Sequence, residues 1–173
     1  MNPSNETWPD DIFRALIDLD VIQIGYVPDA GHTRLIKSCV ADNRVRAVPL
    51  TSEEEGVGLL AGAWLGGQRG ALLMQGSGIG NIVNMLCMAR TCRLPLLMIA
   101  TMRGQWGEMN PWQVPMGQTA EETLKLQDVT VYSVDRPEDV GEAVIAAGRI
   151  AFNGPAMAAV LVSQRIIGTK EFK

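Results

Sequence analysis

Short apolar runs separated by longer amphipathic stretches most constrain how this chain of 173 residues can fold. Six runs predict strands, at residues 21–27, 45–50, 70–75, 96–101, 130–134 and 156–162. They are apolar throughout rather than alternating, which is typical of parallel strands covered on both faces. Helical patterns lie at residues 10–19, 33–41, 52–65, 79–92 and 137–153. This alternation predicts an α/β fold, a doubly wound open parallel sheet of about six strands with helices on both faces.

The length predicts a single domain spanning residues 1–173. A net charge of −4 without a basic cluster argues against nucleic-acid binding. No apolar run approaches the roughly 20 residues of a membrane span, and residues 1–6 lack the pattern of a signal peptide. Cys39, Cys87 and Cys92 are odd in number and lie in apolar surroundings, so we expect buried, unpaired thiols. A soluble cytoplasmic protein is the expectation.

The longest connection runs over residues 102–119 and is rich in glycine and proline. That composition predicts an irregular loop rather than a helix. Loops of this length inside a domain are usually functional or disordered. Because it carries Trp106 and Trp112, we expect it to pack on another subunit or to cover a site.

Polar motifs follow several predicted strands, where ligands of open α/β sheets bind. Glu53, Glu54 and Glu55 stand where one strand gives way to a helix. Their spacing fits a capping box, and acids in the first turn of a helix interact favourably with the helix dipole. Alternatively, they belong to a cofactor cleft in which one acid contacts a heterocycle. The turn at residues 75–81 could bind phosphate or be a generic tight turn. It matches neither the dinucleotide pattern nor the P-loop.

Two further polar side chains admit ordinary interpretations. His32 is the only histidine, so this chain alone can form neither a histidine metal cluster nor a Ser–His–Asp triad. A surface imidazole without a function is the simpler interpretation of His32. Arg103 is equally compatible with a solvated loop charge.

Taken together, the motifs resemble the pyrimidine-binding domain of thiamine-diphosphate-dependent 2-oxoacid decarboxylases. The similarity is strongest to alpha subunits of sulfopyruvate decarboxylases and next to phosphonopyruvate decarboxylases. Matching segments occur in family order over roughly residues 20 to 120. They are residues 27–29, 53–56, 61–64, 74–84 and 103–104, with Gln113 and residues 116–117.

The resemblance implies thiamine diphosphate as the cofactor. In the family one glutamate hydrogen-bonds the aminopyrimidine and promotes loss of the thiazolium proton. Spacing to residues 62–64 places Glu54 in that position, with Glu53 as the fallback. A carboxylic acid in a dry cleft tends to stay protonated and can donate such a bond. The cofactor-binding residues implied beside Glu54 are Gln75, Gly76, Ser77, Gly78, Ile79 and Asn81.

The implied substrate is a small anionic 2-oxoacid, foremost 3-sulfopyruvate, which would give sulfoacetaldehyde and CO2. Arg103 is the candidate for the anionic group, since a guanidinium suits a sulfonate, and Gln113 is a second substrate contact. Asp29 and His32 are candidate catalytic residues that relay a proton. The partner subunit could supply these roles instead. Phosphonopyruvate, another 2-oxoacid, or a non-catalytic regulatory α/β module are the alternatives.

The family's Gly-Asp-Gly motif, which holds magnesium and the diphosphate, does not occur in this sequence. The resemblance therefore implies a separate beta subunit that carries Mg2+ and the diphosphate site. We expect a hetero-oligomer with the cofactor at the interface and at least two copies of each subunit.

Overall fold

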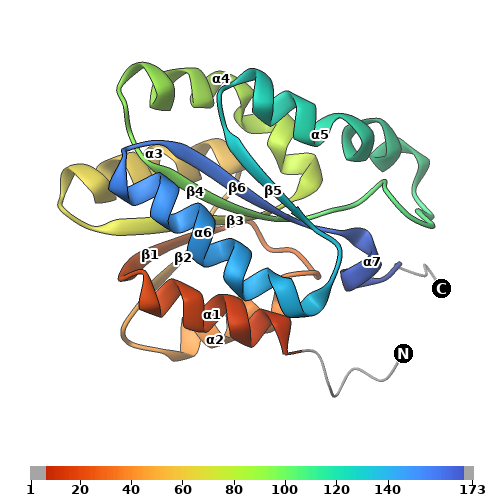
Figure 1. Cartoon of the computed structure of the whole chain (residues 1–173), viewed down its shortest axis with the longest axis horizontal. Coiled ribbons are helices and arrows are strands. Elements are labelled where there is room, and N and C mark those ends of the chain that lie inside the picture. Colours follow the sequence, from red (N-terminus) through yellow and green to blue (C-terminus); the bar gives the residue numbers. More distant parts are fainter. Residues whose placement is uncertain (1–6, 170–173) are drawn as a thin grey trace.

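Six parallel strands form one sheet in the order β2-β1-β3-β4-β6-β5 (Figure 1). The computed structural model describes residues 7–169. The strands are β1 (Val21–Tyr26), β2 (Arg46–Pro49), β3 (Arg69–Gln75), β4 (Leu96–Thr101), β5 (Thr130–Val134) and β6 (Met157–Val162). The predicted sheet is confirmed. The expectations that concern residues 1–6 and the end of the chain lie outside the described residues.

Helices cover both faces of the sheet, as the apolar strands require (Figure 1). The helices are α1 (Trp8–Asp18), α2 (Thr33–Ala41), α3 (Glu53–Leu65), α4 (Ile79–Thr91), α5 (Val114–Leu126), α6 (Val140–Asn153) and the short α7 (Gln164–Ile167). One face packs on α1, α2 and α6, the other on α3, α4 and α5. Strands β4 and β6 are buried along their whole length, as expected of strands with neighbours on both sides. No helix within residues 7–169 is both long and apolar enough to cross a membrane.

The prediction of a helix-free connection over residues 102–119 is wrong in its second half. A 3-10 turn, η3 (Pro111–Gln113), leads into α5, which begins at Val114. Pro115 lies in the first turn of α5, where the missing N–H costs no hydrogen bond. A Cβ on Gly117 would lie 2.1 Å from the carbonyl oxygen of Arg103, so this glycine permits close packing of loop and helix. Pro115 and Gly117, whose residue types argued against a helix, are explained by the helix start and by this close packing.

The prediction of buried cysteines is correct only for Cys39, which lies in α2 and belongs to the hydrophobic core. Cys87 and Cys92 are exposed. The apolar neighbours of Cys87 and Cys92 in the sequence do not indicate that these cysteines are buried, because successive residues of a helix point in different directions.

The course of the chain diverges between the neighbouring strands β1 and β3. The helix that follows β1, α2, packs on one face of the sheet, whereas α4, which follows β3, packs on the other. Loops that diverge in this way leave a crevice at the carboxyl ends of the strands, where ligands of such sheets bind. Most predicted site residues lie at this edge.

Candidate active site

Glu53, the first residue of α3, is buried against the glycine turn that follows β3. Its side chain is 6% exposed, and its Oε2 accepts a hydrogen bond of 2.8 Å from Asn81 Nδ2. A Cβ on Gly78 would lie 2.3 Å from Glu53 Oε1, so only glycine leaves room for this carboxylate. The turn η2 (Gly76–Gly78) is therefore shaped by Glu53 as well as by the strand it follows.

Glu54 faces away from the protein. Its side chain is exposed, and its Oε2 accepts a hydrogen bond of 2.9 Å from Ser52 Oγ. One and two turns further along α3, Gly58 and Gly62 are also exposed, and a Cβ on either would meet no atom within 4 Å. Glu54 thus lies at the start of a strip of α3 surface where Gly58 and Gly62 leave the helix backbone uncovered by side chains.

The capping interpretation of the three acids is correct in part. Glu55 Oε2 accepts a hydrogen bond of 2.8 Å from the backbone N–H of Thr51, close to the pattern of a capping box. Ser52, the N-cap residue, makes no capping bond with its side chain. The three adjacent carboxylates therefore have different roles. Glu53 packs against the glycine turn, Glu55 accepts a hydrogen bond at the helix start, and Glu54 points outward from the surface.

Four predicted site residues meet in one hydrogen-bond network at the edge of the sheet. Gln75 Nε2 donates to Asp29 Oδ1 at 2.9 Å, while Gln75 Oε1 accepts from Ser77 Oγ at 3.0 Å and from Gln113 Nε2 at 3.1 Å. Because an ionised carboxylate can only accept, Asp29 fixes which way the Gln75 amide points. That orientation in turn fixes the amide of Gln113.

Thr101 completes this network and was not predicted. Its Oγ1 donates to Asp29 Oδ2 at 2.5 Å, and the backbone N–H of Gly31 donates to the same oxygen at 3.0 Å. Thr101 is the last residue of β4 and is fully buried. A polar residue at the carboxyl end of an otherwise apolar strand is the sequence signal that could have identified it.

His32 is buried rather than on the surface. It has no exposed area, and its Nε2 lies 3.1 Å from the carbonyl oxygen of Ile99, so Nε2 carries the proton and donates. Nδ1 has no hydrogen-bond partner among residues 7–169. Burial lowers the pKa of His32, and the nearby Asp29 carboxylate opposes this only in part. A neutral, enclosed imidazole packs α2 against the sheet and has no open side toward a ligand in this chain.

Arg103 is part of a buried ion pair with Glu108, whose side chains are 5% and 3% exposed. Arg103 Nε donates to Glu108 Oε2 at 2.7 Å, and Nη2 contacts Oε1. The carboxylate also accepts from the backbone N–H groups of Gly104 and Asn110 and from Gln164 Nε2. These bonds, foremost the one from Arg103, hold the pKa of Glu108 well below its ordinary value. The pair fixes the loop after β4, and the solvated-charge interpretation of Arg103 is wrong.

No group of three or more His, Cys, Asp or Glu side chains that could hold a metal ion occurs within residues 7–169.

Residues 7–123 match the sequence profile of the family described as thiamine pyrophosphate enzyme, N-terminal TPP binding domain. The chain is 31% identical over 152 residues to the sulfopyruvate decarboxylase subunit alpha of Methanococcus maripaludis, covering 87% of this chain and 91% of that protein. It is 38% identical over 129 residues to the same subunit of Methanocaldococcus jannaschii, covering 74% and 76%. With the phosphonopyruvate decarboxylase of Streptomyces viridochromogenes the identity is 36%, over 69% of this chain but only 30% of that protein.

A solved structure shares the fold. The 2-oxoglutarate:ferredoxin oxidoreductase from Magnetococcus marinus superposes with a TM-score of 0.75. The match covers 92% of this chain and 29% of that one, at 17% identity. At this identity the likeness concerns the architecture alone.

Proposed function

This chain belongs to the thiamine pyrophosphate enzymes, and we propose that it is the alpha subunit of a decarboxylase that converts 3-sulfopyruvate to sulfoacetaldehyde and CO2. Its relatives over most of the chain are alpha subunits of sulfopyruvate decarboxylases. The proposal includes a separate beta subunit, which carries Mg2+ and the diphosphate of the cofactor and completes the site. Phosphonopyruvate is the second candidate substrate, supported by the similarity to phosphonopyruvate decarboxylases.

The observation that carries the proposal is the place of Glu54 in the sequence. The spacing to residues 62–64 assigns it to the aminopyrimidine, and its carboxyl group is exposed. We propose that a thiamine ring lies along this part of α3 and that a partner surface closes over it, since Gly58 leaves helix backbone uncovered one turn away. Thiamine diphosphate supplies the electron sink for loss of CO2. In this proposal the Glu54 carboxyl group contacts the pyrimidine, and Glu53, which lies against Gly78 and Asn81, fixes the glycine turn.

Asp29 and Gln113 are proposed to face the substrate at the edge of the sheet. Thr101 and Gln75 hold Asp29, and Gln75 holds Gln113, so both side chains are oriented before a ligand arrives. Oriented groups of this kind lose little entropy on binding. We propose that Asp29 is the group that moves a proton, because His32 has no exposed surface.

The cation that meets the sulfonate is proposed to come from the partner subunit. Arg103, the candidate within this chain, has its Nε and Nη2 bound to Glu108. Meeting a substrate through these atoms would require opening a buried ion pair, and breaking such pairs costs about 3–5 kcal/mol.

The test is the replacement of single acids in the complex assembled with the beta subunit. Glu54→Gln should lower kcat for 3-sulfopyruvate by about 10²- to 10⁴-fold with an unchanged melting temperature. Glu55→Gln is the matched control and should keep most of the activity. Full activity of Glu54→Gln would overturn the assignment. Loss of activity in Glu53→Gln without loss of stability would move the role to Glu53.

Substrate and subunit dependence are measured with the same preparation. The chain alone should show no turnover, and addition of the beta subunit should restore it. A panel of 3-sulfopyruvate, phosphonopyruvate and pyruvate then ranks the substrates by kcat/KM. If no 2-oxoacid is decarboxylated by the complex and Glu54→Gln changes nothing, the chain is a regulatory module rather than an enzyme subunit.

A further inference from the structure

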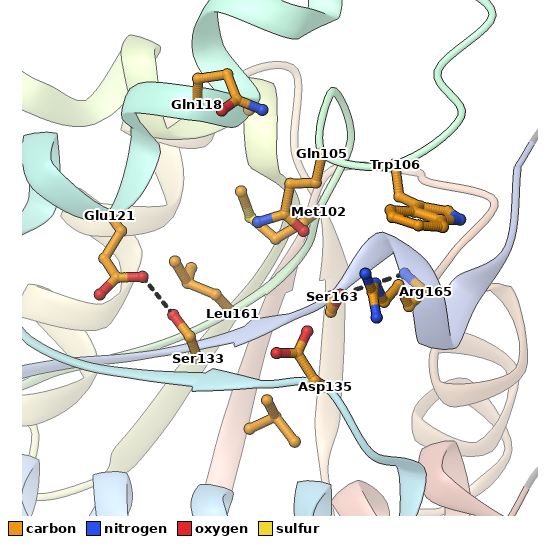
Figure 2. A pocket seen from close by; sticks show the side chains of 12 residues that line it. Met102, Gln105, Trp106, Gln118, Glu121, Ser133, Asp135, Leu161, Ser163 and Arg165 are labelled. Atoms are coloured by element: carbon orange, nitrogen blue, oxygen red, sulfur yellow. Dashed lines mark hydrogen bonds between the residues drawn. The ribbon is translucent and has the colours of Figure 1, made fainter.

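A cavity of about 410 Å3 opens at the carboxyl ends of β4, β6 and β5 (Figure 2). Four segments line it: the loop after β4, helix α5, the end of β5, and the start of α7 after β6. The polar side chains on its walls are Gln105, Gln118, Glu121, Ser133, Asp135, Ser163 and Arg165. None of them is among the predicted site residues.

The topology of the sheet explains why a cavity forms here. The helix that follows β4, α5, packs on one face, whereas α6, which follows β5, packs on the other. Strand β6 lies between β4 and β5, so the chain diverges on either side of its carboxyl end. The divergence is similar to that between the adjacent strands β1 and β3, except that here β6 lies between the two diverging strands. Ligands of open α/β sheets bind at carboxyl ends of this kind. The volume lies within the roughly 300–1,000 Å3 of small-molecule sites.

One of the three charged groups that line the cavity is already neutralised by the protein. Glu121 accepts hydrogen bonds from Ser133 Oγ at 2.6 Å and from Lys125 Nζ, which lies 2.7 Å from its Oε1. These bonds lower the pKa of Glu121, the one from Lys125 most. Glu121 therefore forms a wall of the cavity and offers little to a ligand.

The other two charged groups are exposed and have no counterion in the part of the chain that the structure describes. Asp135 makes no hydrogen bond or ion pair, and Arg165 no ion pair, within residues 7–169. Figure 2 shows the Asp135 carboxylate pointing into the cavity, with Arg165 across from it beside Ser163 and Trp106. The guanidinium carbon of Arg165 lies 4.0 Å from the centre of the Trp106 ring. Stacking holds the guanidinium plane and leaves its N–H edge free to bind a carboxylate.

From these observations we propose that this cavity binds a free α-amino acid, with its ammonium group on Asp135 and its carboxylate on Arg165. A ligand with both charges meets both side chains, whereas an anion alone meets only Arg165 and lies close to the like charge of the exposed Asp135 carboxylate. Placing like charges side by side costs affinity. The 2-oxoacids of the proposed reaction lack the ammonium group, so the cavity discriminates against them.

The test is calorimetric titration of the complete complex with L-serine. Two analogues serve as matched ligands: 3-hydroxypropionate, which lacks the ammonium group, and ethanolamine, which lacks the carboxylate. L-serine should bind, and each analogue should bind at least about tenfold more weakly, because each loses a charge-assisted hydrogen bond. Equal binding of either analogue, or no binding of L-serine at millimolar concentration, overturns the proposal.

Substitutions of the two charged residues test whether L-serine binds in this cavity. Asp135→Asn and Arg165→Gln should each weaken L-serine binding by about tenfold or more. The control is Arg149→Gln, an exposed arginine on α6 that does not line the cavity. Melting temperatures of all three variants should equal that of the unchanged protein, because these side chains are exposed. An L-serine affinity that is unaffected by both cavity substitutions overturns the proposal.

Discussion

The two crevices at the carboxyl edge of the sheet differ in how their polar groups are partnered. In the crevice between β1 and β3, Asp29, Gln75 and Gln113 are bonded to one another, and the adjoining loop is tied by the Arg103–Glu108 pair. In the cavity beyond β6, Asp135 and Arg165 have no such partner within residues 7–169. Groups bonded to each other stabilise the fold and hold a site in shape. Groups without partners contribute little to stability and are available to a ligand.

The same contrast occurs within one turn of α3. Glu53 is buried and bonded to Asn81, whereas its neighbour Glu54 is exposed. Stability and binding are thus divided between different side chains even where the sequence repeats one residue type. Three substitutions and one change of pH, in order of decreasing expected effect, test this difference.

The largest effect is expected from Glu108→Gln. It leaves the buried Arg103 without its counterion and should lower the free energy of unfolding by about 3–5 kcal/mol, measured by urea denaturation. Asp128→Asn is the control, because its ion pair with Arg90 is exposed and should contribute about 0–1 kcal/mol. A loss below about 1 kcal/mol in Glu108→Gln would mean that the pair does not hold the loop.

Acidification should weaken the same pair. The pKa of Glu108 is lowered in the folded protein by the hydrogen bond from Arg103, from an ordinary value of 4.5. The stabilisation is therefore fully present above about pH 4.5 and is lost as the pH falls toward the lower, folded-state pKa. Melting temperatures recorded from neutral to acidic pH should decline less steeply in Glu108→Gln. Parallel profiles for the two proteins would contradict this linkage.

Gly78→Ala should have the next largest effect. The added Cβ would lie 2.3 Å from Glu53 Oε1 and displace the carboxylate from Asn81, at a cost of about 1–3 kcal/mol. Gly62→Ala is the matched control within α3, where a Cβ meets no atom within 4 Å. That change should be neutral or stabilise by up to about 1 kcal/mol, because alanine favours a helix. Similar losses in both variants, measured by urea denaturation, would remove the special role of the glycine turn.

The smallest effect on stability is expected from Asp135→Asn. Its carboxylate makes no ion pair within residues 7–169, so the free energy of unfolding should change by no more than about 0.5 kcal/mol. Urea denaturation measures this change. A loss of more than about 1 kcal/mol would show that Asp135 has a structural role, and the contrast between the two crevices would then fail.

Local patterns were enough to predict the sheet but not every helix. All six strands lie where the apolar runs indicated. Strands β3, β4 and β6 need such runs because they are buried on both faces, whereas the edge strands β2 and β5 are partly exposed. Helix α5 was missed because its early residues include Pro115 and Gly117. Pro115 is compatible with a helix start, and Gly117 is explained only by the approach of the Arg103 carbonyl. From composition alone, a helix that contains these two residues could not be distinguished from a loop.

The candidate site was predicted as a set of residues at the carboxyl ends of strands, and the structure brings Asp29, Gln75, Ser77 and Gln113 together there. Thr101 and Glu108 were missed, because a single polar residue in a strand or loop carries no spacing pattern. Their partners become visible only when the chain is folded.

The fold class and the family could be predicted from the sequence, because strand runs and motifs are local and keep their order along the chain. The tertiary structure alone decided which of three consecutive glutamates is buried, since successive residues of a helix point about 100° apart. It also decided that Arg103 is bound by Glu108 and that Asp135 and Arg165 share one cavity. These outcomes depend on contacts between segments far apart in sequence, which no local pattern encodes.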